Sequence, residues 1–237
     1  MGAPIALSWS RLSDYYQCPL KFKLKYLEKN QKFKEDESAS PHLVRGSNVH
    51  KALENYVVQA TSNGELEVKI TSLPEVEATK PFVDRFIQGY DQVIPETQIA
   101  VNVNWERLEW FDRNTMYRAI FDLIAMRPSD VAIIDYKTGK MRDYDGGPSG
   151  LGQLHLSATI ALNLWPNIPE VSTTYAYVDH KQTVVKKFNQ EDGLRMRKHF
   201  EEEHARVNAD DKFKPTVNEF CKWCPATRDM CPYSRKL

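Results

Sequence analysis

The length, composition and charge of the chain suit one soluble globular domain, since 41% of its 237 residues are hydrophobic and 27% are charged. Its 32 basic and 32 acidic residues cancel, so net charge neither favours nor excludes a nucleic-acid partner. No apolar run reaches the length of a membrane span, and the first residues lack a signal-peptide pattern. We therefore expect a cytoplasmic protein without a membrane partner.

Apolar residues at helical spacing dominate the first part of the chain. A helix is predicted over 8–27, with Ser8 or Ser10 as its cap. A charged, Ser- and Pro-containing stretch over 28–42 predicts a loop. Two further helices are predicted over 46–61 and about 80–94.

The hydrophobic period then changes from helical to alternating, which predicts strands. The predicted elements, in chain order, are strands over 98–111, 115–127 and 131–138, a helix over 150–164, strands over 172–179 and 183–188, and a helix over 190–207. The tail from Pro215 is irregular and rich in Cys and Pro. This order predicts an α/β fold with a mixed sheet of about five strands flanked by helices.

Two carboxylates are expected to face each other on neighbouring strands. If the residues 127–130, RPSD, form a tight turn, counting outward pairs Asp122 with Asp135. Lys137 shares a strand face with Asp135, because residues two apart point the same way. Like charges placed opposite each other are destabilising unless a cation lies between them, which suits Mg²⁺ or Mn²⁺. The alternative is that each aspartate has its own basic partner.

Two other polar side chains, on predicted helices, have either a structural or a functional role. His50 lies on the helix predicted over 46–61, where a core or surface role competes with metal ligation. Gln153 lies at a predicted helix start, where capping or plain solvation competes with a role at a site.

These motifs follow one another in a recognisable order: Gly46-x3-His50, Asp122, Asp135-Tyr136-Lys137-Thr138-Gly139 and Gln153, with one early and three late cysteines. In this order they resemble the RecB-like branch of the PD-(D/E)XK nucleases. The layout is most similar to stand-alone four-cysteine nucleases of CRISPR systems and phages, and to the nuclease domain of AddB. The resemblance implies one nuclease domain over 1–237 with a restriction-endonuclease-like core, in a bacterial, archaeal or phage-infected cell.

The resemblance also implies roles for individual residues. The implied catalytic residues are Asp122, Asp135, Lys137 and Gln153. The implied ligands of Mg²⁺ or Mn²⁺ are His50, Asp122, Asp135 and the main-chain carbonyl of Tyr136. This set matches what phosphodiester hydrolysis needs, a nucleophile at neutral pH and positive charge at the transition state. One detail departs from the family pattern, because Ser157 stands where a tyrosine is usual. The family often has an acidic residue on the strand before the first aspartate, and Glu106 is our candidate for it.

Four cysteines in a cytoplasmic chain are poorly explained by disulfides. They are Cys18, Cys221, Cys224 and Cys231. Spacing alone leaves Zn²⁺ and a [4Fe–4S] cluster open. The resemblance implies the iron–sulfur cluster, which would join the terminal segments 1–45 and 208–237.

The expected partner is DNA, either single-stranded or with free ends. Lys21, Lys25 and Arg45 are candidate phosphate contacts, with a solvated helix face as the alternative. The resemblance favours a metal-dependent exonuclease with 5′-to-3′ polarity. Because no G-x4-G-K-[ST] motif occurs, we expect a stand-alone enzyme or a subunit of a nuclease or recombination complex. The competing hypothesis is a non-catalytic module on a degenerate nuclease fold that binds DNA ends or a partner.

Overall fold

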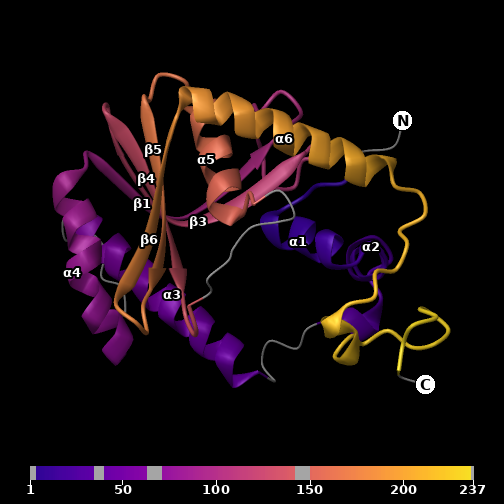
Figure 1. The fold of residues 1–237 in the computed structure, drawn as a ribbon. Helices are drawn as coiled ribbons and strands as arrows, with labels where there is room; N and C mark the ends of the chain where they lie inside the picture. Colours follow the sequence, from indigo (N-terminus) through magenta and orange to yellow (C-terminus); the bar gives the residue numbers. More distant parts are fainter. Residues whose placement is uncertain (1–3, 35–39, 63–70, 142–149, 236–237) are drawn as a thin grey trace.

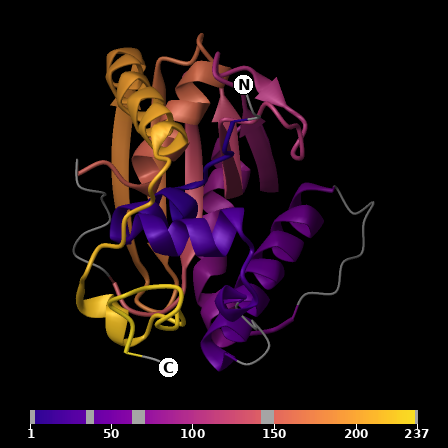
Figure 2. The same ribbon diagram turned by 90° about the vertical axis from the view of Figure 1, so that its right-hand side faces the viewer.

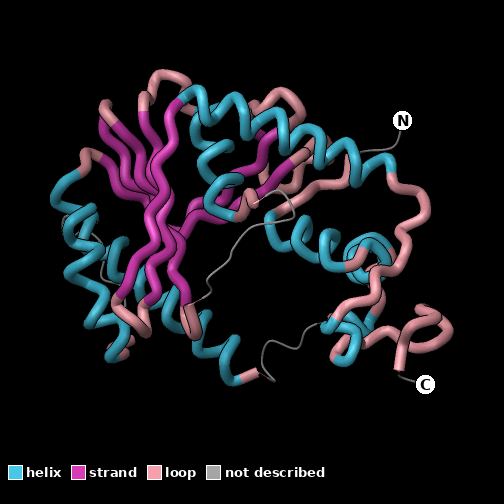
Figure 3. Tube along the Cα trace, viewed as in Figure 1, coloured by secondary structure: helices cyan, strands magenta, loops and turns pink. Residues whose placement is uncertain are grey.

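A six-stranded mixed sheet forms the centre of the structure, a computed structural model that describes residues 4–34, 40–62, 71–141 and 150–235. The strand order is β2-β1-β3-β4-β5-β6, one strand more than predicted. The strands are β1 Gln92–Val101, β2 Arg107–Leu108, β3 Tyr117–Arg127, β4 Asp130–Lys137, β5 Glu170–Tyr177 and β6 Gln182–Asn189. Neighbours are antiparallel except β4 and β5, which are parallel. Figure 3 shows the twist of this sheet.

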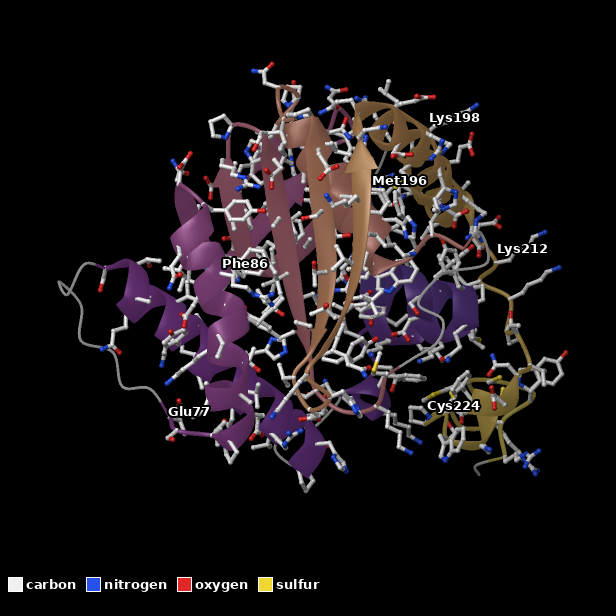
Figure 4. The ribbon with its side chains drawn as sticks, turned by 60° about the vertical axis from the view of Figure 1, so that its left-hand side comes forward. Glu77, Phe86, Met196, Lys198, Lys212 and Cys224 are labelled. Carbon is white, nitrogen blue, oxygen red and sulfur yellow. The ribbon has the colours of Figure 1, made fainter. Side chains whose placement is uncertain are left out.

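Helices cover both faces of the sheet, which makes a three-layer α/β domain (Figure 1). On one face lie α3 Pro41–Thr61 and α4 Pro74–Gly89, and on the other lie α5 Gln153–Leu164 and α6 Gln190–Ala209. Each helix layer has its own buried apolar cluster against the strands. Figure 4 shows Met196 of α6 facing inward and Lys198 facing outward, as expected for an amphipathic helix.

The central strand β4 is buried on both sides, which explains its continuous apolar run. Ile133 packs in the cluster under α5 and α6, whereas Ile134 packs in the cluster under α3 and α4. The strand ends at Lys137, and Gly139 follows with φ of 96°, a conformation that glycine adopts without strain. The strand and turn predicted from VAIIDYKTGK are therefore confirmed.

The predicted register between β3 and β4 is confirmed near the turn, but the pairing ends before Asp122 and Asp135, so their predicted direct opposition is not observed. Arg127 pairs with Asp130 across the turn, and the same register holds up to the pair Leu123 and Ile134. β3 then becomes irregular at Asp122, because Phe121 and Leu123 pack in clusters on opposite faces although they are two residues apart. An irregularity of this kind within a strand is common beside functional sites, where it redirects a side chain.

The prediction of one continuous helix over 8–27 is wrong. α1 Trp9–Gln17 ends at Cys18, which has extended backbone angles, and a new helical segment starts as α2 Pro19–Phe22 and continues as η1 Lys23–Leu27. The physical reason is Pro19, because proline disfavours the helical conformation in the residue before it. The break places Cys18 at a corner between two helical segments. Figure 2 shows α1 crossing in front of the sheet.

Several predicted boundaries are corrected by the structure. α3 starts five residues before the predicted 46–61, with Pro41 in its first turn, and α4 covers Pro74–Gly89 instead of 80–94. Both starts carry proline at a first-turn position, where its missing N–H costs nothing. The strand predicted over 98–111 is instead the end of β1, a turn and β2. The loop predicted over 28–42 contains η2 Gln31–Phe33, and its residues 35–39 lie outside the described part.

The C-terminal tail lies beside the first helices although about two hundred residues separate them. Apart from η4 Glu219–Lys222, the described tail from Pro215 has no regular element, as predicted. Asn218 donates a hydrogen bond of 2.8 Å from Nδ2 to the carbonyl of Gln17. Figure 4 shows Cys224 within this tail. None of the helices in the described ranges is long and apolar enough to cross a membrane.

Candidate active site

The middle of β3 and the end of β4 carry the predicted acidic and basic side chains of the site. Asp122 Oδ2 accepts a hydrogen bond of 2.7 Å from the backbone N–H of Tyr136. The ammonium of Lys137 lies 2.5 Å from Asp135 Oδ2 on the same strand. Both aspartate side chains are largely buried, so each needs these partners to remain ionised.

His50 reaches the same place from α3. Its Nδ1 lies 3.2 Å from Asp122 Oδ1, and its ring meets the Tyr136 ring edge to face at 6.0 Å. Gly46, one turn earlier, permits this approach, because a Cβ there would lie 3.1 Å from Thr138 Oγ1. A helix that carries glycine at this position can therefore pack close to the end of β4.

Gln153 connects the carboxylate to the lysine from the other face of the sheet. Its Nε2 donates to Asp135 Oδ1 at 2.6 Å, and its Oε1 accepts from Lys137 Nζ at 3.0 Å. The alternative role as a helix cap does not apply, because α5 is capped by Gly152, whose N–H donates to His155 Nδ1. Gln153 therefore fixes the relative positions of Asp135 and Lys137.

The electrostatic environment shifts two pKa values in the group. Burial raises the pKa of Asp135 to about 6, with the lowering effect of Lys137 and a further rise from Asp122 as smaller contributions. For His50, burial acts to lower the pKa, but the hydrogen bond and charge of Asp122 outweigh it and the net shift is upward. A buried carboxylate beside a second one is typical of sites that bind cations.

The donor chemistry of this group fits a hard divalent cation. The two carboxylates are oxygen ligands that suit Mg²⁺ and Mn²⁺, whereas the imidazole of His50 adds a nitrogen ligand of a kind more usual for later transition metals. Asp135 Oδ2 is buried and accepts no hydrogen bond of acceptable geometry, so its contact with Lys137 leaves a lone pair available. Among the described residues, no group of three or more His, Cys, Asp or Glu side chains is already arranged around a common metal position.

Two acidic residues beside the site were missed by the sequence analysis. Glu96 on β1 and Glu54 on α3 line a cavity of about 430 Å³ with His50. Burial raises the pKa of Glu96, and the charges of Asp122 and Glu54 add to the rise. The predicted strand began at residue 98, and Glu96 has φ of 43°, which interrupts the alternation. Glu106, the candidate from the sequence, lies instead in the turn before β2.

The predicted DNA-contacting cations are paired with acidic groups. Lys21 and Lys25 lie 2.7 and 3.2 Å from the carboxylate of Asp14. Arg45 contacts both Glu75, at 2.9 Å, and Asp179. Their charges are therefore partly compensated within the fold, and their contact with DNA stays a prediction.

A cavity of about 850 Å³ opens beside Lys137. Its walls carry Lys137, Gln153 and Tyr175 from the sheet side, and Trp9 and Tyr26 from the N-terminal helices. The Lys137 ammonium lies 4.8 Å from the centre of the Tyr175 ring. The cavity thus places the Lys137 ammonium beside aromatic rings.

The four cysteines line one cavity of about 330 Å³ between the N-terminal helices and the tail. All four are free thiols: Cys18, Cys221, Cys224 and Cys231. The backbone N–H groups of Thr216 and Asn218 each lie 3.4 Å from a sulfur, that of Cys18 and that of Cys221 respectively. Cysteines from both ends of the chain therefore meet at one cavity, and a shared metal or cluster there stays a prediction.

A six-stranded mixed sheet between helices, with acidic residues on two of its central strands, is consistent with a restriction-endonuclease-like core. The family model of the PD-(D/E)XK nuclease superfamily matches residues 6–232, nearly the whole chain. The chain therefore belongs to the PD-(D/E)XK nuclease superfamily, which implies a nuclease with a nucleic-acid substrate. The RecB-like branch and the four-cysteine layout stay predictions.

Other comparisons add little to this assignment. No curated protein matches the sequence. Among solved structures, the chain is similar to one described as "Crystal structure of SSO0001", with 16% sequence identity and a TM-score of 0.47. That similarity covers 93% of this chain and 83% of the other.

Proposed function

We propose that this protein is a metal-dependent DNA exonuclease that hydrolyses phosphodiester bonds on single strands or at free ends, with 5′-to-3′ polarity. The observation that carries the proposal is the contact set of Asp135, Lys137 and Gln153 at the wall of the 850 Å³ cavity. Superfamily membership supports hydrolysis, whereas the aromatic lining of the cavity supports a substrate with exposed bases.

The donor set would hold Mg²⁺ or Mn²⁺ through His50, Asp122, Asp135 and the main-chain carbonyl of Tyr136. A divalent cation bound there supplies a nucleophile at neutral pH and positive charge for the scissile phosphate. Lys137 adds a second positive charge where the transition state gathers negative charge, and Gln153 keeps its ammonium in place. Asp122 is held by the N–H of Tyr136, so it needs little reorganisation to act as a ligand.

We propose further that the four cysteines hold a [4Fe–4S] cluster, with Zn²⁺ as the alternative. Their shared cavity supports a common ligand. The N–H groups directed at two of the sulfurs support thiolate ligation, because hydrogen bonds to sulfur are a usual part of such sites.

The experiment that tests the function is digestion of 5′-labelled and 3′-labelled single strands and a closed single-stranded circle. We expect Mn²⁺-dependent release of short products from linear strands, beginning at the 5′ end, with the circle intact and EDTA stopping the reaction. Cleavage of the circle would contradict the exonuclease assignment. DNA binding without cleavage of any substrate would favour the non-catalytic module instead.

The His50→Ala variant is expected to raise the Mn²⁺ concentration needed for half-maximal activity by about tenfold, with partial recovery in excess Mn²⁺. The reason is that an imidazole is one ligand among several, and loss of one ligand weakens a site without removing it. A titration of activity against Mn²⁺ measures the effect, with His199→Ala on α6, which does not line the cavity beside His50, as the control. An unchanged metal requirement would return His50 to a packing role.

A further inference from the structure

A second cavity, of about 380 Å³, adjoins the candidate active site on its other side. It lies between the start of α1, β3 and the start of α5, and its wall shares Gln153, Trp9 and Ser10 with the larger cavity. Gln153 is the residue that also contacts Asp135 and Lys137. The second cavity is therefore separated from the candidate reaction centre by one side chain.

Two arginines face this cavity without an acidic counterpart. Arg11 and Arg118 both line it, and no Asp or Glu occurs among its described lining residues. The Nε of Arg118 is buried and has no hydrogen-bond partner in the described parts of the chain. Nη1 of Arg11 donates to the carbonyl of Ala6 at 2.7 Å. An unsatisfied buried guanidinium nitrogen costs free energy, which a bound anion would recover.

Trp110 and Ser157 also line the cavity, and Phe111 lies next to it, against Arg118. The Arg118 guanidinium stacks 5.5 Å from the Trp110 ring and 5.9 Å from the ring of Phe111, which is 85% exposed. Ser157 of α5 lines the opposite wall, where its short side chain leaves the volume open. Burial lowers the pKa of Arg11, and the nearby charge of Arg118 acts in the same direction, which agrees with two uncompensated cations in one space.

We propose that this cavity binds the terminal phosphate monoester of a DNA strand, with Arg11 and Arg118 on the phosphate and Trp110 or Phe111 against the adjoining base. The proposal rests on the proposed nuclease function, whose substrate end it specifies. A monoester carries nearly two negative charges at neutral pH, whereas an internal diester carries one. Two guanidiniums without an acidic neighbour match the charge of the monoester, and the N-terminus of α1 adds to the attraction.

The test is a binding measurement in EDTA, where no cleavage interferes. Fluorescently labelled single strands carry a 5′-phosphate, a 3′-phosphate or only hydroxyl ends, and a circle has no end. We expect the wild-type protein to bind either the 5′-phosphorylated or the 3′-phosphorylated strand about tenfold more tightly than the strand with hydroxyl ends. This is the effect of about one charge-assisted hydrogen bond. The variants Arg118→Gln and Ser157→Tyr should lose this preference, because the first removes a charge and the second fills the cavity.

The matched control is Arg113→Gln, which removes an exposed arginine that does not line the cavity and should keep the preference. Two results would overturn the proposal: equal wild-type affinity for all ends, or an equal loss of affinity for strands and circle in Arg118→Gln. If Arg118→Gln fails to fold, Ser157→Tyr decides the matter alone. A protein that prefers phosphorylated ends but cuts no DNA would overturn the nuclease proposal and support the phosphate-binding cavity. A protein that cuts DNA without this preference would support the nuclease proposal and overturn the phosphate-binding cavity.

Discussion

Hydrolysis by the Lys137→Ala and Asp135→Asn variants is expected to fall by about 10²–10³-fold or more, while affinity for DNA changes little. Lys137 contributes charge that matters chiefly in the transition state, so its loss lowers turnover more than binding. Asp135 is the carboxylate that contacts both Lys137 and Gln153, so its replacement disturbs all three groups. Single-turnover cleavage and metal-free binding of the same labelled strand separate the two effects.

Lys140→Ala is the charge-matched control, because Lys140 lines the same cavity three residues further along the chain. We expect it to weaken binding modestly and to keep the turnover rate at saturating DNA. The proposed roles are wrong if either active-site variant cuts DNA at the wild-type rate. They are also wrong if Lys137→Ala and Lys140→Ala behave alike.

Cys18→Ala is expected to release the metal and to loosen both ends of the chain. Protein purified without oxygen should be brown, with iron and acid-labile sulfide in about equal amounts, and the variant should be colourless. Limited proteolysis should then cut near α1 and in the tail after Pro215, whereas the central sheet resists. Thr216→Ala should keep the colour, because Thr216 contacts the Cys18 sulfur through its backbone N–H.

The large effect expected for Cys18→Ala follows because few other contacts attach the tail after Pro215 to the rest of the chain. Only Ala226 and Thr227 are buried among the described tail residues after Pro215. Binding energy at a four-thiolate site is folding energy, and the site closes a loop of about two hundred residues. Colourless protein with stoichiometric zinc would keep the attachment and refute iron–sulfur. Metal-free protein with four titratable thiols and an undiminished melting temperature would refute both.

Local sequence patterns were sufficient to predict the strands that carry the candidate site. The run from Val131 to Ile134 predicted β4 because a strand buried on both faces needs an unbroken apolar sequence. The RPSD turn then defined the pairing of β3 with β4, since a short hairpin leaves little freedom of register. Contact between Asp135 and Lys137 follows from the two-residue period of a strand.

The remaining features depend on contacts between residues far apart in the chain. The irregularity of β3 at Asp122 and the approach of Glu96 arise where β1, β3 and α3 pack together, so no local pattern signals them. The bridging role of Gln153 requires α5 to cross behind β4, and the paired arginines require α1 to meet β3. By itself the sequence determined that Asp122 stands on β3 and that Asp135 and Lys137 stand near the end of β4. Only the tertiary structure decided which of them meet, because burial and charge pairing are settled when distant elements pack.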